Sequence, residues 1–381
     1  MKQAAPNNQG YDAYDVAIIG LGPAGATLAR LLDPKLKTIA IDKKSDGTVS
    51  FCKPCGGLLA PDAQKALSKF NLTLPKDVLV DPQIFAVKTM DTAQNLLRYY
   101  QRFYMNFDRH KFDMWLISLI PDHVTIATGA RCHSVAKVGE LYEIAYSRQH
   151  LSSGQEEGLR RDERATPPYV EHITARYVVG ADGANSVLRR QLFPQRKIRQ
   201  YVSVQQWFVE EHPVPFYSCV FDHRVTDSYC WSISKDGCFI LGGAFPIDKS
   251  KERFALLKDA LQKNGFAFGD VLKTEACLVS RPQGLRGFCA AQGGAFLVGE
   301  AAGFISPSSL EGISYALNSG HALATVLNGN RQNPARDYRL KTVPIRIKLL
   351  LKSLKSPFMY NRFLRKLVMK SGLSSVKVMH T

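Results

Sequence analysis

The chain has 381 residues, 45% of them hydrophobic and 22% charged, and a formal net charge of +17. This length allows two domains or one discontinuous pair, and the composition is that of an ordinary globular protein. No run of about 20 apolar residues is present, which excludes a membrane-spanning helix, and residues 1–12 are too polar for a signal peptide. The eight cysteines form no small-domain disulfide framework, so we expect a cytoplasmic location.

Residues 14–43 have the pattern of a strand, a helix and a second strand. The apolar run Val16–Ile19 predicts a buried parallel strand, and Thr38–Ile41 predicts the second one. Three glycines between them have the spacing Gly-x-Gly-x-x-Gly: Gly20, Gly22 and Gly25. Asp42 ends the second strand, about 20 residues after the glycines. These features in this order predict a dinucleotide-binding unit rather than a plain glycine-rich turn.

Each residue type of this unit has a physical reason. Gly20 allows the tight turn, Gly22 lets the backbone approach a pyrophosphate, and Gly25 lets the helix pack close to the strand. The helix N-terminus supplies N–H groups and the positive end of the helix dipole. The carboxylate of Asp42 is expected to bind a ribose hydroxyl.

A loop with the sequence Cys-x-x-Cys-Gly-Gly follows at residues 52–57. A Cys-x-x-Cys pair can be a redox dithiol or half of a zinc site. Zinc needs a second pair, and the other cysteines are single and scattered, so no metal is predicted. A working dithiol stays open. The favoured interpretation is that the two glycines let the backbone crowd a cofactor, with Cys55 held beside it.

The middle of the chain mixes strands with one helix that carries a candidate ligand. Residues 83–90 and 96–103 predict two strands of a second domain. Residues 106–120 predict a helix with Arg109 near its start, where the helix dipole favours anions over cations. Arg109 is therefore either a phosphate contact or part of a surface ion pair. Further strands are predicted at 124–127, 131–135, 142–146 and 172–179.

Two more turns carry candidate ligand contacts. Residues 180–183 read Gly-Ala-Asp-Gly at the end of a strand, which brings the backbone and the Asp182 carboxylate to a ligand. Residues 294–298 predict another buried strand, which leads into Gly-Glu-Ala-Ala-Gly at 299–303. A helix opens near 310–317 and runs to about 328. An antiparallel sheet is predicted from strands at 202–210, 216–221, 229–234 and 238–245, with a helix at 251–264.

The last 51 residues carry most of the charge. Residues 331–381 hold 13 Lys or Arg and one acid, a net +12, whereas the other 330 residues have a net +5. Apolar residues recur at helical spacing among these cations: Ile345, Leu349, Leu350, Leu354, Phe358, Phe363, Leu364, Leu367 and Val368. Such helices suit an anionic membrane surface, here through 344–381. The alternative is a helix pair that packs on the body with a solvated basic face. No nucleic-acid-reading motif is present.

The three glycine motifs, in this order, resemble those of glutathione-reductase-type FAD proteins with a para-hydroxybenzoate-hydroxylase-like fold. Together they resemble the geranylgeranyl reductase family, most of all its bacterial CbrA-like branch, over nearly the whole chain. The resemblance implies an α/β protein with a FAD-binding Rossmann domain, an antiparallel-sheet substrate domain and basic C-terminal helices. The implied FAD-binding domain comprises 13–80, 104–196 and 280–330, the substrate domain 81–103 and 197–279, and the helices 331–381.

The resemblance also implies a set of FAD contacts. Arg109 matches the Arg of the family's Arg-x-x-Phe-Asp helix, and Cys55 and Gly56 match its Cys-Gly loop beside the flavin. Glu300 replaces the usual Asp of the third motif. The implied cofactor-binding residues are Gly20, Gly22, Pro23, Ala24, Gly25, Asp42, Lys43, Cys55, Gly56, Arg109, Arg131, Asp182, Gly299, Glu300, Gly312 and Ile313.

The family's substrate-pocket pattern Tyr-x-Trp-x-Phe-Pro-Lys is only partly matched. Tyr229 and Trp231 correspond to its aromatic residues and Lys235 to its lysine, but Ile-Ser replaces Phe-Pro. Both aromatic residues are therefore candidates for the pocket wall. Plain packing within the sheet is the alternative, since aromatic residues favour strands.

The implied reaction is hydride transfer from reduced FAD to a C=C bond of a prenyl or related lipid, with Cys55 as the candidate proton donor. Only one dinucleotide fingerprint is present, so the electron donor is expected to be a transient NAD(P)H or a ferredoxin-like protein. The alternatives are a flavin monooxygenase of the same fold and a membrane-associated flavoprotein with a non-catalytic or resistance role. The enzyme is expected in the cytoplasm, at the inner face of the cytoplasmic membrane.

Overall fold

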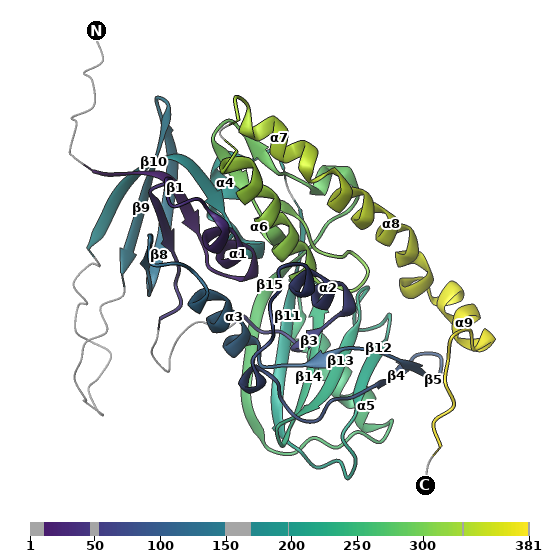
Figure 1. Ribbon diagram of the computed structural model, residues 1–381. Helices are drawn as coiled ribbons and strands as arrows, with labels where there is room; N and C mark the ends of the chain where they lie inside the picture. Colours follow the sequence, from purple (N-terminus) through teal and green to yellow (C-terminus); the bar gives the residue numbers. More distant parts are fainter. Residues whose placement is uncertain (1–10, 46–52, 149–168, 197, 330, 380–381) are drawn as a thin grey trace, which may run out of the picture.

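Two large sheets, joined by helices along one side, dominate the described part of the protein (Figure 1). The structure is a computed structural model, and it describes residues 11–45, 53–148, 169–196, 198–329 and 331–379. The expected Cys52–Cys55 pair lies partly outside these residues, because Cys52 is not among them.

The first sheet has the strand order β16-β17-β10-β1-β2-β7, with β9 pairing on β10 and β8 on β9. β1 lies between β10 and β2 and is parallel to both, as the buried run Val16–Ile19 predicts. Ile19 pairs with Gly180, so the Gly-x-Gly-x-x-Gly and Gly-Ala-Asp-Gly turns leave the sheet side by side. The bounds are β1 Asp12–Ile19, β2 Thr38–Ile41, β7 Val124–Ala127, β8 Ala130–Val138, β9 Leu141–Arg148, β10 Val170–Gly180, β16 Ala291–Gln292 and β17 Ala295–Leu297.

The second sheet has seven strands in the order β15-β11-β14-β13-β12-β4-β5. It draws strands from two separate stretches, 86–101 and 199–281. It is antiparallel as expected except between β12 and β4, which are parallel. β15, an edge strand of 11 residues, was not predicted from the sequence. The bounds are β4 Ala86–Asp91, β5 Leu96–Gln101, β11 Arg199–Val209, β12 Tyr217–Phe221, β13 Cys230–Lys235, β14 Cys238–Phe245 and β15 Val271–Arg281; the short β3 Leu58–Leu59 pairs with β6 Met105–Asn106 outside this sheet.

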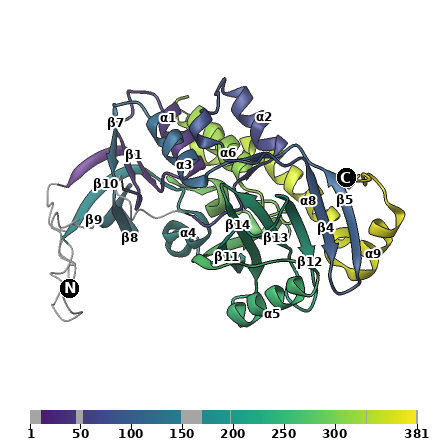
Figure 2. The same ribbon diagram turned by 90° about the horizontal axis from the view of Figure 1, so that it is seen from below.

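The second sheet buries both of its faces. Helix α5 (Ser250–Gln262) lies along one face (Figure 2). Its Phe254, Leu257 and Leu261 pack there on aromatic side chains of the sheet. On the other, Val87, Tyr217 and Ile233 turn toward the loops that lie between the two sheets. The bounds of the helices outside the C-terminal region are α1 Pro23–Leu31, α2 Pro61–Lys69, α3 Arg109–Ser118, α4 Val187–Leu192, α5 Ser250–Gln262 and α6 Ile313–Leu327.

The helix expected at 106–120 is shorter, because Asp108 accepts a hydrogen bond from the Lys111 N–H at 2.9 Å and so caps α3. Met105 and Asn106, before the cap, form β6 instead. This start places Arg109 in the first turn of α3.

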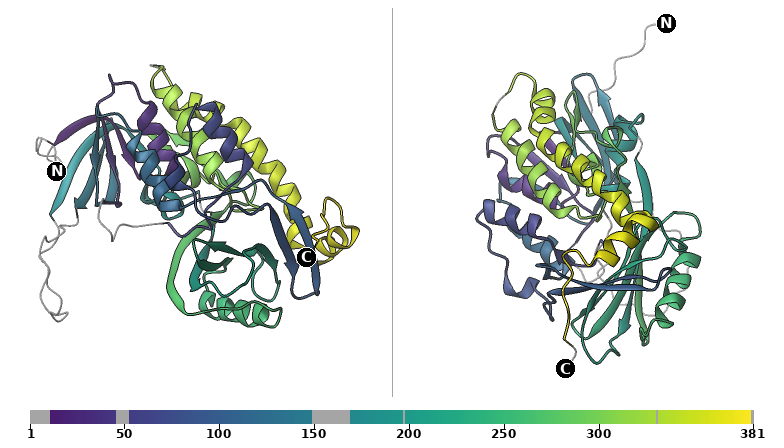
Figure 3. Two further views of the ribbon diagram at one scale, coloured as in Figure 1. Left: turned by 60° about the horizontal axis from the view of Figure 1, so that its bottom comes forward. Right: turned by 90° about the vertical axis from the view of Figure 1, so that its right-hand side faces the viewer.

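The three C-terminal helices run along one side of the molecule, from the first sheet to the far edge of the second (Figure 3). They are α7 Pro334–Lys341, α8 Val343–Tyr360 and α9 Arg362–Ser371. Tyr338 of α7 donates to the Leu297 carbonyl at 3.0 Å, and Arg365 of α9 reaches the buried Asp91 of β4 at 2.7 Å. Among the described residues, no helix is long and apolar enough to cross a membrane.

Candidate active site

A cavity of about 1530 Å³ reaches from the carboxyl edge of the first sheet to the second sheet. It is lined by every sequence-predicted site residue except Gly25 and Gly299. The residues brought together are Gly20, Gly22, Pro23, Ala24, Asp42, Lys43, Cys55, Gly56, Arg109, Arg131, Asp182, Tyr229, Trp231, Glu300, Gly312 and Ile313. The three glycine motifs and the two aromatic residues therefore face one space.

The three glycines of the first motif have different surroundings. Gly22 is the N-cap of α1, and a Cβ atom there would meet no atom within 4 Å, so it would project into the cavity. Gly25 instead allows close packing, because its Cβ would lie 1.9 Å from the Gly20 carbonyl oxygen. Gly20 has φ +100°, which favours glycine. A phosphate group in the cavity could therefore approach the N–H groups at the N-terminus of α1.

A second helix N-terminus faces the same cavity. Gly312 is the N-cap of α6, and it supplies no side chain to the first N–H groups. Glu311 accepts the Ser314 N–H at 2.8 Å, and burial raises the pKa of this carboxyl. The N-termini of α1 and α6 place two positive dipole ends on one cavity, which favours an anionic ligand at both places.

Asp42 is fixed by its own chain. Its carboxylate accepts the Leu21 N–H and, at 2.7 Å, the Lys44 N–H, while the Lys44 ammonium lies 3.5 Å away. Lys44 is buried and also lies 3.8 Å from Asp113. Lys44 was not predicted as a site residue, because the local sequence pattern does not distinguish a buried lysine from an exposed one. A ribose hydroxyl at Asp42 would share the carboxylate with these donors.

Asp182 offers a buried acceptor. One carboxylate oxygen accepts the Val187 N–H at 2.6 Å, whereas its Oδ1 atom has no partner among the described residues. Burial raises the pKa of this carboxyl. An unpaired buried polar atom is costly, so a ligand donor at this place would be favoured.

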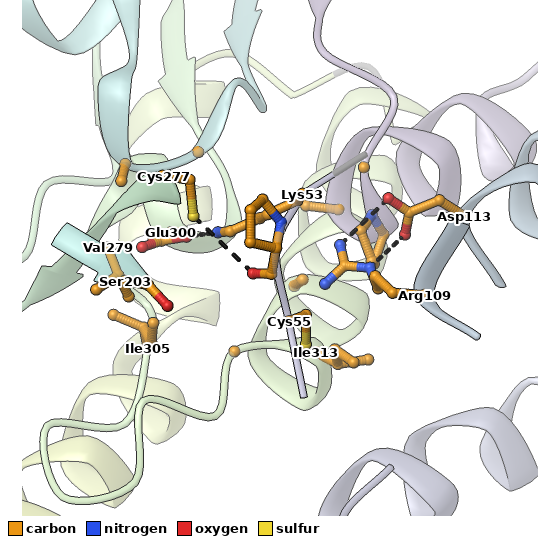
Figure 4. A pocket seen from close by; sticks show the side chains of 18 of the residues that line it. Lys53, Cys55, Arg109, Asp113, Ser203, Cys277, Val279, Glu300, Ile305 and Ile313 are labelled. Atoms are coloured by element: carbon orange, nitrogen blue, oxygen red, sulfur yellow. Dashed lines mark hydrogen bonds and ion pairs between the residues drawn. The ribbon is translucent and has the colours of Figure 1, made fainter. Parts of the chain in front are cut away.

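Glu300 is engaged on both oxygens. Oε2 is ion-paired with Lys53 (Figure 4), and Oε1 accepts the Ser280 N–H at 2.7 Å. Burial alone would lower the pKa of Lys53, but the Glu300 carboxylate raises it above its usual value. A ligand hydroxyl at Glu300 would therefore join an existing ion pair that the sequence did not reveal.

Arg109 is paired within its own helix. Its guanidinium binds both oxygens of Asp113, at 2.8 and 3.3 Å. Burial opposes its charge, but the Asp113 carboxylate raises the pKa of Arg109 well above its usual range. Of the two alternatives for Arg109, the structure shows an ion pair, but a buried one rather than one at the surface, and it places a cation beside Cys55. The Gly57 N–H donates to the Cys55 sulfur at 3.5 Å.

Lys235 holds the loop that carries Cys55. This buried ammonium at the end of β13 donates to the carbonyls of Phe107 at 2.8 Å, Gly56 at 3.1 Å and Gly57 at 3.5 Å. Burial lowers its pKa to about 8. Gly57 has φ +64°, and a Cβ there would lie 2.2 Å from the Lys235 nitrogen. The contact therefore needs a glycine in the loop.

The far end of the cavity is aromatic. The Tyr229 hydroxyl donates to the Ser309 carbonyl at 2.7 Å, and the Tyr104 and Tyr217 rings meet edge to face. The Trp231 indole packs so closely on β14 that a Cβ at Gly242 would lie 2.3 Å from it, and it also faces Gly56. Trp231 thus packs within the sheet and lines the cavity at the same time.

The edge strand β15 adds residues that were not predicted. Cys277 and Val279 line the cavity (Figure 4). The Cys277 sulfur lies 3.9 Å from the Pro54 carbonyl oxygen, and burial raises the pKa of this thiol to about 11. The thiol therefore stays neutral at physiological pH.

Comparison with known proteins gives the family. No family model matches the sequence. Protein CbrA from an Escherichia coli O6:H1 strain is 49% identical over 364 residues, which cover 95% of this chain and 94% of that protein. The chain belongs to the CbrA family. Protein CbrA of Shigella sonnei is 48% identical, over 95% of this chain and 98% of its own.

Comparison with solved structures tests the expected fold class. A geranylgeranyl bacteriochlorophyll reductase-like protein from Thermoplasma acidophilum has a TM-score of 0.67 at 21% identity, covering 97% of this chain and 89% of its own. The flavin-dependent brominase Bmp2 has a TM-score of 0.64 at 19% identity, covering 94% and 92%. PqsL from Pseudomonas aeruginosa, described as a probable FAD-dependent monooxygenase, has 0.63 at 15%, covering 94% and 100%. The expected α/β fold class, which these three solved structures share, is confirmed.

Proposed function

We propose that the protein is an FAD-dependent oxidoreductase that reduces a C=C bond of a prenyl or related lipid. The observation that carries the proposal is the single cavity from the N-terminus of α1 to Trp231. Ligand pockets usually measure roughly 300–1,000 Å³, so about 1530 Å³ leaves room for a dinucleotide and a second ligand together.

Four features of the chain fit FAD. Gly22 leaves open space at the N-terminus of α1, where a pyrophosphate would lie. Asp182 keeps a buried acceptor without a partner among the described residues. The N-terminus of α6 at Gly312 and Ile313 favours negative charge, which suits the electron-rich edge of a flavin ring. Lys43 and Arg131 line the cavity beside Asp42 and would face the adenosine side.

The aromatic end of the cavity suits an uncharged hydrocarbon. Burial raises the pKa values of Tyr104, Tyr217 and Tyr229, so all three hydroxyls stay neutral at physiological pH. The rings of these three tyrosines and of Trp231 together offer a large apolar surface. An alkene chain that lay along them would bring one double bond next to the Cys55–Gly56 loop.

FAD, when bound and reduced, supplies a hydride to one carbon of the alkene. The other carbon must then gain a proton, and we assign its donor as the Cys55 thiol. The S–H bond breaks as the new C–H bond forms, and the resulting thiolate faces the cations of Arg109 and Lys235. Solvent returns the proton to the sulfur. Cys55 is the catalytic residue of this proposal, and Lys235 is a positioning residue.

The oxidised cofactor must regain two electrons after each turnover. The described chain offers one dinucleotide fold, so the donor is assigned to NAD(P)H that visits the cavity or to a ferredoxin-like protein. We place this reaction at the inner face of the cytoplasmic membrane.

The test uses protein loaded with FAD and reduced without oxygen. One half is mixed anaerobically with a geranylgeranyl lipid in detergent, and the other half is mixed in air. The proposal predicts flavin reoxidation in the first half and a lipid mass that rises by two hydrogens. A lipid that changes only in air, by gain of oxygen, would instead establish a monooxygenase. Unchanged lipid in both halves, with flavin that stays reduced without oxygen, would support the non-catalytic alternative.

The role of Cys55 is tested in the same anaerobic assay. Cys55→Ser should retain FAD and slow reoxidation by about 10²-fold, the usual contribution of a general acid. Cys238→Ser is the matched control, because Cys238 lies on β14 and does not line the cavity. Equal rates for both variants would remove Cys55 from the mechanism.

A further inference from the structure

Helix α8 is apolar on two opposite faces. The inner face packs on the core of the first sheet through Leu349, which is fully buried, and Ile345. The outer face has four large apolar side chains at spacings of four, three and four residues, each more than half exposed: Ile347, Leu351, Leu354 and Phe358. The apolar residues of α8 are thus divided between a face that packs on the body and a face that points away from it.

Helix α9 continues the same arrangement. Arg365 and Met369 turn inward and are buried, whereas Phe363 and Leu367 are 68% and 69% exposed. Exposed apolar residues scattered singly need no explanation, but six of them on consecutive helices form a patch that marks an interaction site. We call these six residues the outer stripe.

Cations accompany the outer stripe. Three exposed lysines stand next to its members in the sequence, Lys348, Lys355 and Lys366, and the exposed Lys370 follows Leu367 by three residues. Residues 331–381 carry a net charge of +12. A helix surface that combines exposed Leu and Phe with lysines matches an anionic lipid surface, where the side chains enter the acyl boundary and the lysines meet the headgroups. A second copy of this chain would bring a like charge against it, which opposes self-association.

The outer stripe lies close to one end of the cavity. Lys352 of α8 and Asp62 of α2 both line the cavity and are partly exposed, so the cavity reaches the surface between them. Asp62 is ion-paired with Lys352 at 3.2 Å and with Lys348 at 2.8 Å. The helix that carries the stripe therefore also borders the end of the cavity that reaches the surface.

We propose that the outer stripe of α8 and α9 docks on an anionic lipid bilayer and holds the Asp62–Lys352 end of the cavity at the membrane surface. The docking stands on the C-terminal helices alone. Its use, the entry of a lipid substrate between α2 and α8, rests on the function proposed above.

The experiment measures co-sedimentation of the full chain with vesicles of phosphatidylglycerol and phosphatidylcholine, and with phosphatidylcholine alone. We expect binding to the first vesicles, and weaker binding as salt is raised. The variant Leu354→Ser/Phe358→Ser/Phe363→Ser should bind about tenfold less or weaker still. The matched control replaces exposed apolar residues away from these helices, Phe85→Ser/Val214→Ser/Leu256→Ser, and should bind as the original chain does.

A second measurement needs no loss of apolar surface. Phe358→Trp should be quenched by brominated lipids in phosphatidylglycerol vesicles beyond the quenching of the native tryptophans, whereas Leu256→Trp on α5 should not. Absence of vesicle binding, equal binding by the stripe variant, or equal quenching of both tryptophan variants would overturn the proposal. So would a dimer of the original chain that the stripe variant abolishes. None of these readouts depends on turnover, and the anaerobic assay in detergent does not depend on vesicles, so either proposal can fail alone.

Discussion

Replacing Lys235 with methionine tests the buried ammonium that holds the Cys55 loop. Methionine keeps the apolar stem and removes the charge together with the donors to Gly56, Gly57 and Phe107. Each hydrogen bond from a charged donor contributes about 1.5–3 kcal/mol. Against this stands the cost of burying the ammonium, which lowers its pKa from 10.5 to about 8. At about 1.4 kcal/mol for each pKa unit, that cost is about 3 kcal/mol.

The pH dependence of the unfolding free energy separates the cost of burying the Lys235 ammonium from the gain of its hydrogen bonds. Between pH 8 and 10.5 the unfolded chain binds the Lys235 proton more tightly than the folded chain does. The free energy of unfolding therefore rises with pH across this window, and the gain is lost again as pH falls through 8. The difference in unfolding free energy between the original chain and Lys235→Met should grow by about 3 kcal/mol from pH 7 to pH 10.5.

Urea unfolding of both proteins across this pH range measures the difference. Taking the difference cancels the titration of groups that the two proteins share. Lys263→Met, at an exposed lysine, is the control and should show no such trend. A difference between the original chain and Lys235→Met that stays constant with pH would refute the argument from burial.

Two further substitutions test contacts that support the site. Gly25→Ala should prevent folding or cost more than about 4 kcal/mol of unfolding free energy, because its Cβ would lie 1.9 Å from the Gly20 oxygen. The control Gly22→Ala, whose Cβ would meet no atom within 4 Å, should change the unfolding free energy by no more than about 1 kcal/mol. Equal losses for the two variants in urea unfolding would contradict this packing. Arg365→Met should cost about 3–5 kcal/mol, since it leaves Asp91 buried without its cation, and Arg365→Met/Asp91→Asn should recover most of the loss. A double variant no more stable than Arg365→Met would show that the ion pair is not what holds α9.

The parts of the fold that the sequence predicted are those with a local signal. Val16–Ile19 is apolar on every residue because β1 is covered on both faces, and Thr38–Ile41 has the same reason. β15 was not predicted because it is an edge strand. Its first four residues, Val271–Thr274, are all exposed, so this strand lacks the alternation of buried and exposed residues that predicts a strand. Its pairing with β11 along 10 residue pairs, rather than its own pattern, makes it a strand.

The glycine motifs placed most of the candidate site, because they mark where the backbone must turn or approach a ligand. The partners of the charged residues could not be predicted from the local sequence. Lys53 meets Glu300 across 247 residues, and Lys235 meets Gly56 across 179. Only the fold brings these pairs together. The two faces of α8 show the same limit, since periodicity counts apolar residues but does not say which of them the body covers.

The most direct test of the account is equilibrium binding of FAD to the full chain and to Gly22→Leu. The substitution places a side chain in the open space at the N-terminus of α1, where φ is −70° and any residue is allowed. We predict one FAD bound for each original chain, and no FAD bound by a Gly22→Leu protein with an unchanged circular dichroism spectrum. Equal binding by the two proteins, or no binding by the original chain, would contradict it.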